Sequence, residues 1–108
     1  MSNLQFNAGN TLAVPAINTD KGHLLWALLR HGAKTVEELQ KLTDIRGISP
    51  RVHDLNNPLA IVYTTPAQKV RKDGKTVDVV RYHVNLNLVD LNQQIWQDFL
   101  ANGDAIYG

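Results

Sequence analysis

The segment that decides the fold runs from Thr35 to Leu55 and reads TVEELQKLTDIRGISPRVHDL. It opens with Thr35-Val36-Glu37-Glu38, a capping-box pattern in which a Thr hydroxyl and a Glu three positions later satisfy each other's backbone amides. Apolar residues at helical spacing extend this helix to about Thr43. Gly47 lies in the short turn that follows, and Ser49-Pro50 is typical of a helix cap and first helical position. The segment therefore predicts two short helices joined by a tight turn.

A third helix is predicted directly before this pair. Thr19 or Asp20 suits its N-cap, leucines follow at helical spacing, and Gly32 suits its end. Three helices in this order form a helix-turn-helix layout. Residues 1–18 have no sustained period, so we expect an arm or loop there, either disordered or packed on a partner.

The pattern changes to that of a β-hairpin after Pro58. Residues 59–64 are rich in β-branched and apolar side chains, residues 66–75 form a polar turn region that contains Asp73-Gly74, and residues 76–84 form a return strand. A two-stranded hairpin is marginally stable alone. We therefore expect it to lie against the helices as a wing and to complete a domain over residues 19–86.

A fourth helix is predicted over residues 88–102, with Asn87 as its cap and Gly103 at its other end. Its apolar stripe can pack on the first helix, or it can form a dimer interface over residues 87–103. Both interpretations stay open. The candidate interface residues are Leu88, Leu91, Ile95, Trp96 and Phe99.

Composition limits the class of protein. The 108 residues are 44% hydrophobic and 19% charged, which is typical of one soluble globular domain. With no cysteine, a disulfide scaffold and cysteine-ligated metal centres are excluded. No apolar run is long enough to span a membrane and no signal-peptide pattern is present, so we expect a cytoplasmic protein. The four histidines are scattered and no catalytic motif occurs, so we expect no metal, no cofactor and no enzymatic activity.

The net charge of +1 conceals a segregation along the chain. Residues 21–83 hold all eleven basic residues and six acids, a net charge of +5, whereas residues 1–20 and 84–108 carry −1 and −3. A basic middle between neutral or acidic ends indicates a polyanionic partner.

This chain resembles a small family of winged helix-turn-helix domains that is common in bacteriophage and prophage proteins. The resemblance covers roughly residues 20–84. It rests on Ile48–Leu55 (ISPRVHDL) and on Gly74–Val77 (GKTV) followed by Val80–Val84 (VRYHV). It implies a winged helix-turn-helix fold and binding to double-stranded DNA. With the fourth helix predicted above, we expect an α+β winged helix-turn-helix domain with an added C-terminal helix. We expect it to act as a small phage-derived transcriptional regulator and as a homodimer.

In such a module the third helix enters the major groove. Arg51 is the predicted base reader, because arginine suits guanine; Ser49, His53 and Asn56 would support it. The wing and the helix starts would hold the phosphate backbone. The predicted backbone contacts are Thr35, Arg46, Lys69, Arg71, Lys72 and Lys75.

Other interpretations stay open beside this one. Arg51 and Asp54, three positions apart on a helix, can simply pair with each other, and basic hairpin tips often serve solubility. A winged domain can also bind and inhibit a host protein, an alternative favoured by the modest +5, by Pro50 and by the Asn-rich end of the third helix. A phage structural or packaging subunit is a further possibility. Acids interrupting the positive surface, at Asp44, Asp54 or Asp73, would favour the protein partner.

Overall fold

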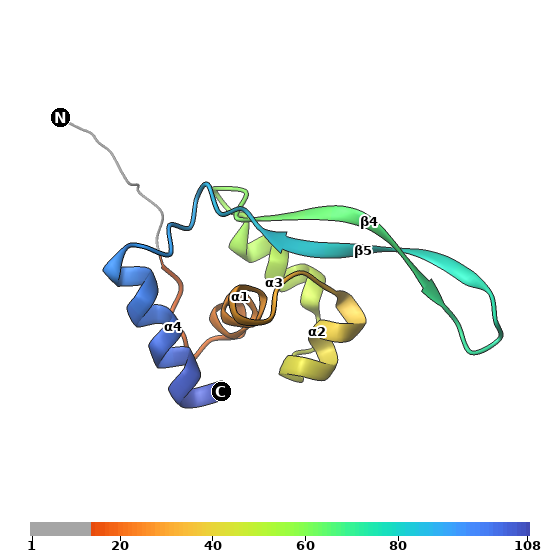
Figure 1. Ribbon diagram of the computed structural model, residues 1–108, viewed down its shortest axis with the longest axis horizontal. Helices are drawn as coiled ribbons and strands as arrows, with labels where there is room; N and C mark the ends of the chain where they lie inside the picture. The colour runs from red at the N-terminus through yellow and green to blue at the C-terminus, as the bar shows by residue number, and fades with distance from the viewer. Residues whose placement is uncertain (1–13) are drawn as a thin grey trace.

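The computed structural model describes residues 14–108, so the expected arm over residues 1–18 lies mostly outside the described part. The elements in chain order are α1 (Asp20–His31), β3 (Lys34–Thr35), α2 (Val36–Thr43), α3 (Ile48–Leu55), β4 (Val62–Val70), β5 (Thr76–Val84) and α4 (Gln94–Tyr107). The strands form an antiparallel sheet in the order β3-β5-β4. Within residues 14–108, four helices and a three-stranded sheet confirm the α+β class. Figure 1 shows the helices grouped together, with the β4–β5 hairpin projecting beyond them.

The predicted starts of α1 and α2 are confirmed. Thr19 caps α1 by accepting a hydrogen bond from the Gly22 amide at 3.2 Å. In α2 the capping box is complete: the Thr35 hydroxyl accepts from the Glu38 amide at 3.3 Å, and Glu38 Oε1 accepts from the Thr35 amide at 2.9 Å. Gly32 ends α1 with a φ of 83°, a conformation that favours glycine.

The start of α3 differs from the sequence prediction. The N-cap is Gly47, with a φ of 71° and no side-chain cap, and Ser49 already lies inside the helix. Ser49 as N-cap is therefore wrong. Ile48 is 1% exposed, so the left-handed turn at Gly47 directs this side chain into the core and the helix begins with it.

The hairpin is longer than predicted. β4 begins at Val62 instead of residue 59 and continues through Pro66 to Val70, inside the expected polar turn region. An edge strand tolerates proline, because its outer side has no ladder hydrogen bond to lose. The return strand β5 has the predicted bounds. The short strand β3 was not predicted; it pairs Lys34 and Thr35 with β5 and so joins the start of α2 to the hairpin.

The core forms around α1, which contacts α2, α3, α4 and β5. Each helix contributes one buried stripe, and the base of the hairpin contributes Val62 and Tyr82. The most completely buried large side chains are Leu24, Leu25, Leu39, Ile48, Val89 and Trp96.

The bounds predicted for α4 are wrong at both ends. Residues before Gln94 form turns, in which the Asp90 side chain accepts from the Asn92 amide at 2.9 Å. Leu88 and Leu91 therefore precede the helix. Gly103 does not end α4 but lies buried within it, because α4 there packs directly on the Trp26 ring.

The C-terminal half of α4 is fastened to α1 by polar and aromatic contacts. Trp26 Nε1 donates to Asp104 Oδ1 at 2.9 Å, and Arg30 Nε donates to the same oxygen at 2.8 Å. The His23 ring stacks on Tyr107 with centroids 3.5 Å apart, and burial lowers the pKa of His23. α4 therefore packs against its own chain.

This packing corrects part of the predicted dimer interface. Trp96 is 2% exposed and Phe99 is 4% exposed, and both belong to the core of their own chain. As dimer contacts they are wrong, because a partner would not reach them in the folded domain. Leu88 is half-buried, whereas Leu91 and Ile95 remain exposed.

Candidate nucleic-acid interface

Helix α3 has an inner face that packs in the core and an outer face that is polar. Ile48, Val52 and Leu55 form the buried stripe. Ser49 and His53 are exposed on the other side of the helix. The Ser49 hydroxyl lies 3.2 Å from the hydroxyl of Tyr82 on β5, which joins the start of α3 to the sheet.

Arg51, the predicted base reader, pairs with its neighbour on the helix. Its Nε lies 3.5 Å from Asp54 Oδ2, and the two side chains stay 40% and 48% exposed. The Nε atom itself is buried and makes no hydrogen bond within the described part of the chain. The structure thus contains the pairing that the sequence left open. Exposed pairs of this kind contribute little stability, so releasing Arg51 from Asp54 costs little free energy.

Asn56 has a structural role in this fold. Its Nδ2 donates to the Val62 carbonyl at 2.9 Å, and the Val62 amide donates to its Oδ1 at 2.8 Å. Both polar atoms of the half-buried amide are engaged in this way. Asn56 therefore fastens the end of α3 to the first residue of β4, and these two bonds compete with its predicted contact to a base.

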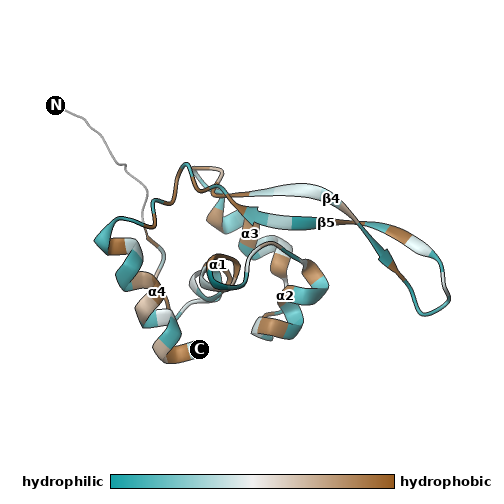
Figure 2. Cartoon of the chain, viewed as in Figure 1, coloured by the Kyte–Doolittle hydropathy of each residue, from teal (hydrophilic) through white to brown (hydrophobic). Residues whose placement is uncertain are grey.

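The end of the hairpin concentrates positive charge. Residues 69–75 contain four basic residues and one acid, a net charge of +3. The turn closes through Gly74, with a φ of 84°, and through the Asp73 carboxylate, which accepts from the Lys75 amide at 3.0 Å. Figure 2 shows the loop between the strands as hydrophilic. The predicted hairpin cations Lys69, Arg71, Lys72 and Lys75 are thus brought together.

Two acids in the first turn of α2, Glu37 and Glu38, form ion pairs with the hairpin. The sequence did not indicate that they belong to the site. Lys69 Nζ lies 2.8 Å from Glu37 Oε1, and Arg81 Nη1 lies 3.5 Å from Glu38 Oε1. The hydrogen bond from Lys69 lowers the pKa of Glu37, and the backbone hydrogen bond from Thr35 lowers the pKa of Glu38. The Thr35 hydroxyl, predicted to touch phosphate, serves the capping box. No local pattern identifies Glu37 or Arg81, because their partners are distant in sequence.

The predicted basic contacts fall into two groups. Arg51, Lys69 and Arg71 each have a carboxylate partner, with Arg71 Nη2 3.6 Å from Asp73 Oδ2. Within residues 14–108, the other three form no ion pair with a carboxylate: Arg46, Lys72 and Lys75. The positive surface is therefore interrupted on α3 and at the α2–hairpin junction.

Among residues 14–108, no group of three or more histidine, aspartate or glutamate side chains is placed to hold a metal ion. No helix in this range has the length and apolar character needed to cross a bilayer.

Comparison with protein-family models finds no match, and comparison with curated proteins finds no similar sequence.

Proposed function

We propose that this protein is a winged helix-turn-helix domain that binds double-stranded DNA. The order helix, strand, helix, helix, hairpin, with the short strand β3 on the far side of β5 from β4, supports this fold. The observation that carries the proposal is the hairpin end, with a net charge of +3, projecting beyond the helices (Figure 1). Asn56 fixes the base of this hairpin to α3, so helix and wing would meet DNA as one unit.

In this proposal α3 faces the major groove and the hairpin meets the backbone beside it. Arg51 would exchange Asp54 for guanine O6 and N7, with Ser49 and His53 nearby. Arg46, in the turn before α3, and the hairpin lysines would contact phosphates. A regulator acting as a homodimer would place two α3 helices about one DNA turn apart, joined through exposed residues such as Leu91 and Ile95.

The test is fluorescence anisotropy with a labelled random duplex over a series of salt concentrations. The variant Lys72→Gln/Lys75→Gln should bind more weakly and lower the slope of log K against log salt by about two, because each lost phosphate contact contributes roughly 0.9. Lys21→Gln/Lys41→Gln removes the same charge from exposed positions on α1 and α2 and is the matched control. No binding at about 50 mM salt, or equal losses in both variants, would overturn the proposal.

Base reading requires a separate experiment. A duplex sequence selected from a random pool should lose about 1–3 kcal/mol of binding free energy with Arg51→Ala, whereas binding to random duplex changes less. An unchanged preference for the selected sequence in Arg51→Ala would remove Arg51 as base reader.

A protein-binding role is the second candidate. It is favoured by the acids beside Arg51, Lys69 and Arg71, which reduce the positive surface available to a polyanion. The salt series separates the two candidates, since a protein-binding module need not bind duplex DNA even at low salt.

A further inference from the structure

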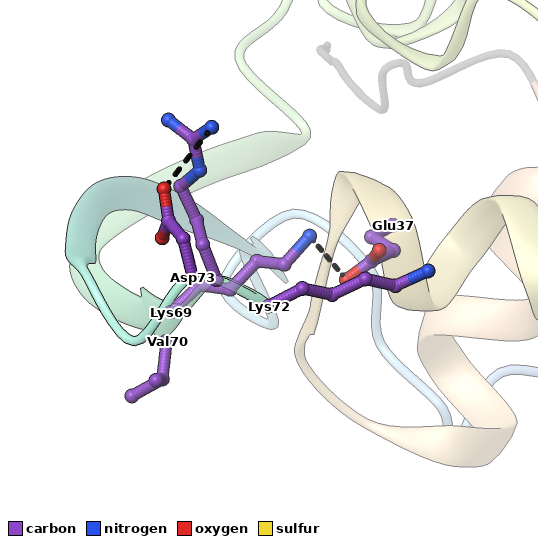
Figure 3. Close-up of a pocket in the computed structure, with 6 residues that line it drawn as sticks. Glu37, Lys69, Val70, Lys72 and Asp73 are labelled. Atoms are coloured by element: carbon purple, nitrogen blue, oxygen red, sulfur yellow. Dashed lines mark ion pairs between the residues drawn. The ribbon is translucent and has the colours of Figure 1, made fainter.

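Glu37 lies where the helices meet the hairpin. It belongs to the first turn of α2, and its Oε1 lies 2.8 Å from Lys69 Nζ near the end of β4. Both side chains are about half exposed, at 48% and 42%. The pair closes one side of an open cleft of about 440 Å³, drawn in Figure 3.

The cleft is lined by three cations, two carboxylates and one valine. Apart from Glu37, the lining residues all belong to the hairpin: Lys69, Val70, Arg71, Lys72 and Asp73. Asp73 pairs with Arg71 within the loop, so Glu37 is the carboxylate that faces Lys69. In Figure 3 the Lys72 side chain also extends toward Glu37, although the two form no ion pair. Glu37 therefore neutralises Lys69, one of the two hairpin cations that pair with α2.

We propose that Glu37 occupies, on Lys69, the place that a DNA phosphate would take, and so holds the free wing against α2 and lowers the affinity for duplex DNA. This inference rests on the proposed function. A carboxylate and a phosphate are alternative oxyanion partners for one exposed ammonium group. In the complex Lys69 turns to phosphate, and Glu37 is left beside the polyanion, which opposes binding.

The hairpin keeps its other attachments when Glu37 is neutralised. Glu38 still pairs with Arg81 and completes the capping box, and β3 still pairs with β5. Glu37→Gln should therefore fold, which circular dichroism and thermal unfolding would check.

The test is a double-mutant cycle with Glu37→Gln, Lys69→Gln and the double variant, in the same anisotropy assay. Glu37→Gln should bind random duplex roughly two- to fivefold more tightly, as expected for release of one exposed ion pair. Lys69→Gln should change the affinity less than twofold in the natural chain, but should abolish the gain in the Glu37→Gln background.

Asp78→Asn is the control, because it removes one negative charge from the same hairpin. The Asp78 side chain accepts a hydrogen bond from Gln68 and forms no ion pair within residues 14–108. Equal gains from Asp78→Asn and Glu37→Gln, or a Lys69→Gln effect that is independent of residue 37, would overturn the inference while leaving DNA binding intact. If no variant binds duplex at low salt, the proposed function fails and the inference fails with it. An NMR titration of the Glu37 carboxyl group gives a readout without DNA: its pKa should rise in Lys69→Gln, and an unchanged pKa would contradict the pairing.

Discussion

Gly103 decides how closely α4 approaches α1. A Cβ at this position would lie 2.2 Å from Trp26 Cδ1 and 2.7 Å from Trp26 Nε1, and Trp26 is 4% exposed. Gly103→Ala should therefore lower the free energy of unfolding by about 1–3 kcal/mol, as overpacked cores do. Urea unfolding would measure this, with Asn102→Ala at the neighbouring exposed position as control. A Gly103→Ala variant as stable as the natural chain would contradict the packing of α4 described above.

Asp104 makes the stability depend on pH. The hydrogen bond from Arg30, and then that from Trp26, holds the pKa of Asp104 below its ordinary value. A carboxyl group with a lowered pKa in the folded state stabilises the fold above its unfolded pKa, about 4, and this contribution disappears as the pH falls through the folded pKa. Asp104→Asn should thus be less stable than the natural chain at pH 7, with a difference that shrinks below pH 4. Urea unfolding across this pH range would check it; a difference that is constant with pH would rule out the linkage.

The junction between α3 and β4 depends on Asn56. Asn56→Ala leaves the amide and carbonyl of the buried Val62 without their partners, so the free energy of unfolding should fall by about 1–3 kcal/mol. Asn57→Ala, at the adjacent exposed asparagine, is the matched control for loss of an amide side chain. Chemical denaturation of both variants would measure the effect. Equal stability of the two variants would mean that Asn56 does not fasten the hairpin.

Elements with local signals were predictable from the sequence. Thr19, the capping box at Thr35 and the turn at Gly74 act on residues only a few positions away, and their elements start or turn where expected. Two of the elements predicted wrongly depend on distant partners. Gly103 lies inside α4 because the helix packs there on the Trp26 ring, and the length of β4 depends on its pairing with β5.

The candidate site follows the same distinction. The basic residues of the hairpin are visible in the sequence, and the Arg51–Asp54 pair is a local spacing on one helix. The Lys69–Glu37 pair joins two elements far apart in the chain. The bonds of Asn56 to Val62 span a loop whose path the sequence does not specify. Only the assembled fold reveals these contacts.

At the scale of the whole molecule, the buried residues of α4 should affect folding, whereas its exposed residues are the ones available for assembly. Trp96 is 2% exposed within its own chain, so Trp96→Ala should lower the free energy of unfolding by about 3–5 kcal/mol. Ile95→Ala, at a residue that is 56% exposed, should change it little. Thermal unfolding and sedimentation velocity would test this together. A Trp96→Ala protein that stays fully stable but dissociates from dimer to monomer would contradict it.

The most direct test of the proposed DNA-binding surface is an NMR titration of the ¹⁵N-labelled protein with a short duplex at low salt. The account predicts that amide shifts change at the turn and first half of α3, from Arg46 to His53, and at the hairpin end, residues 69–75. Residues of α4 and the start of α1 should not respond. Shift changes centred on α4, or none at any DNA concentration, would contradict DNA binding by helix α3 and its wing.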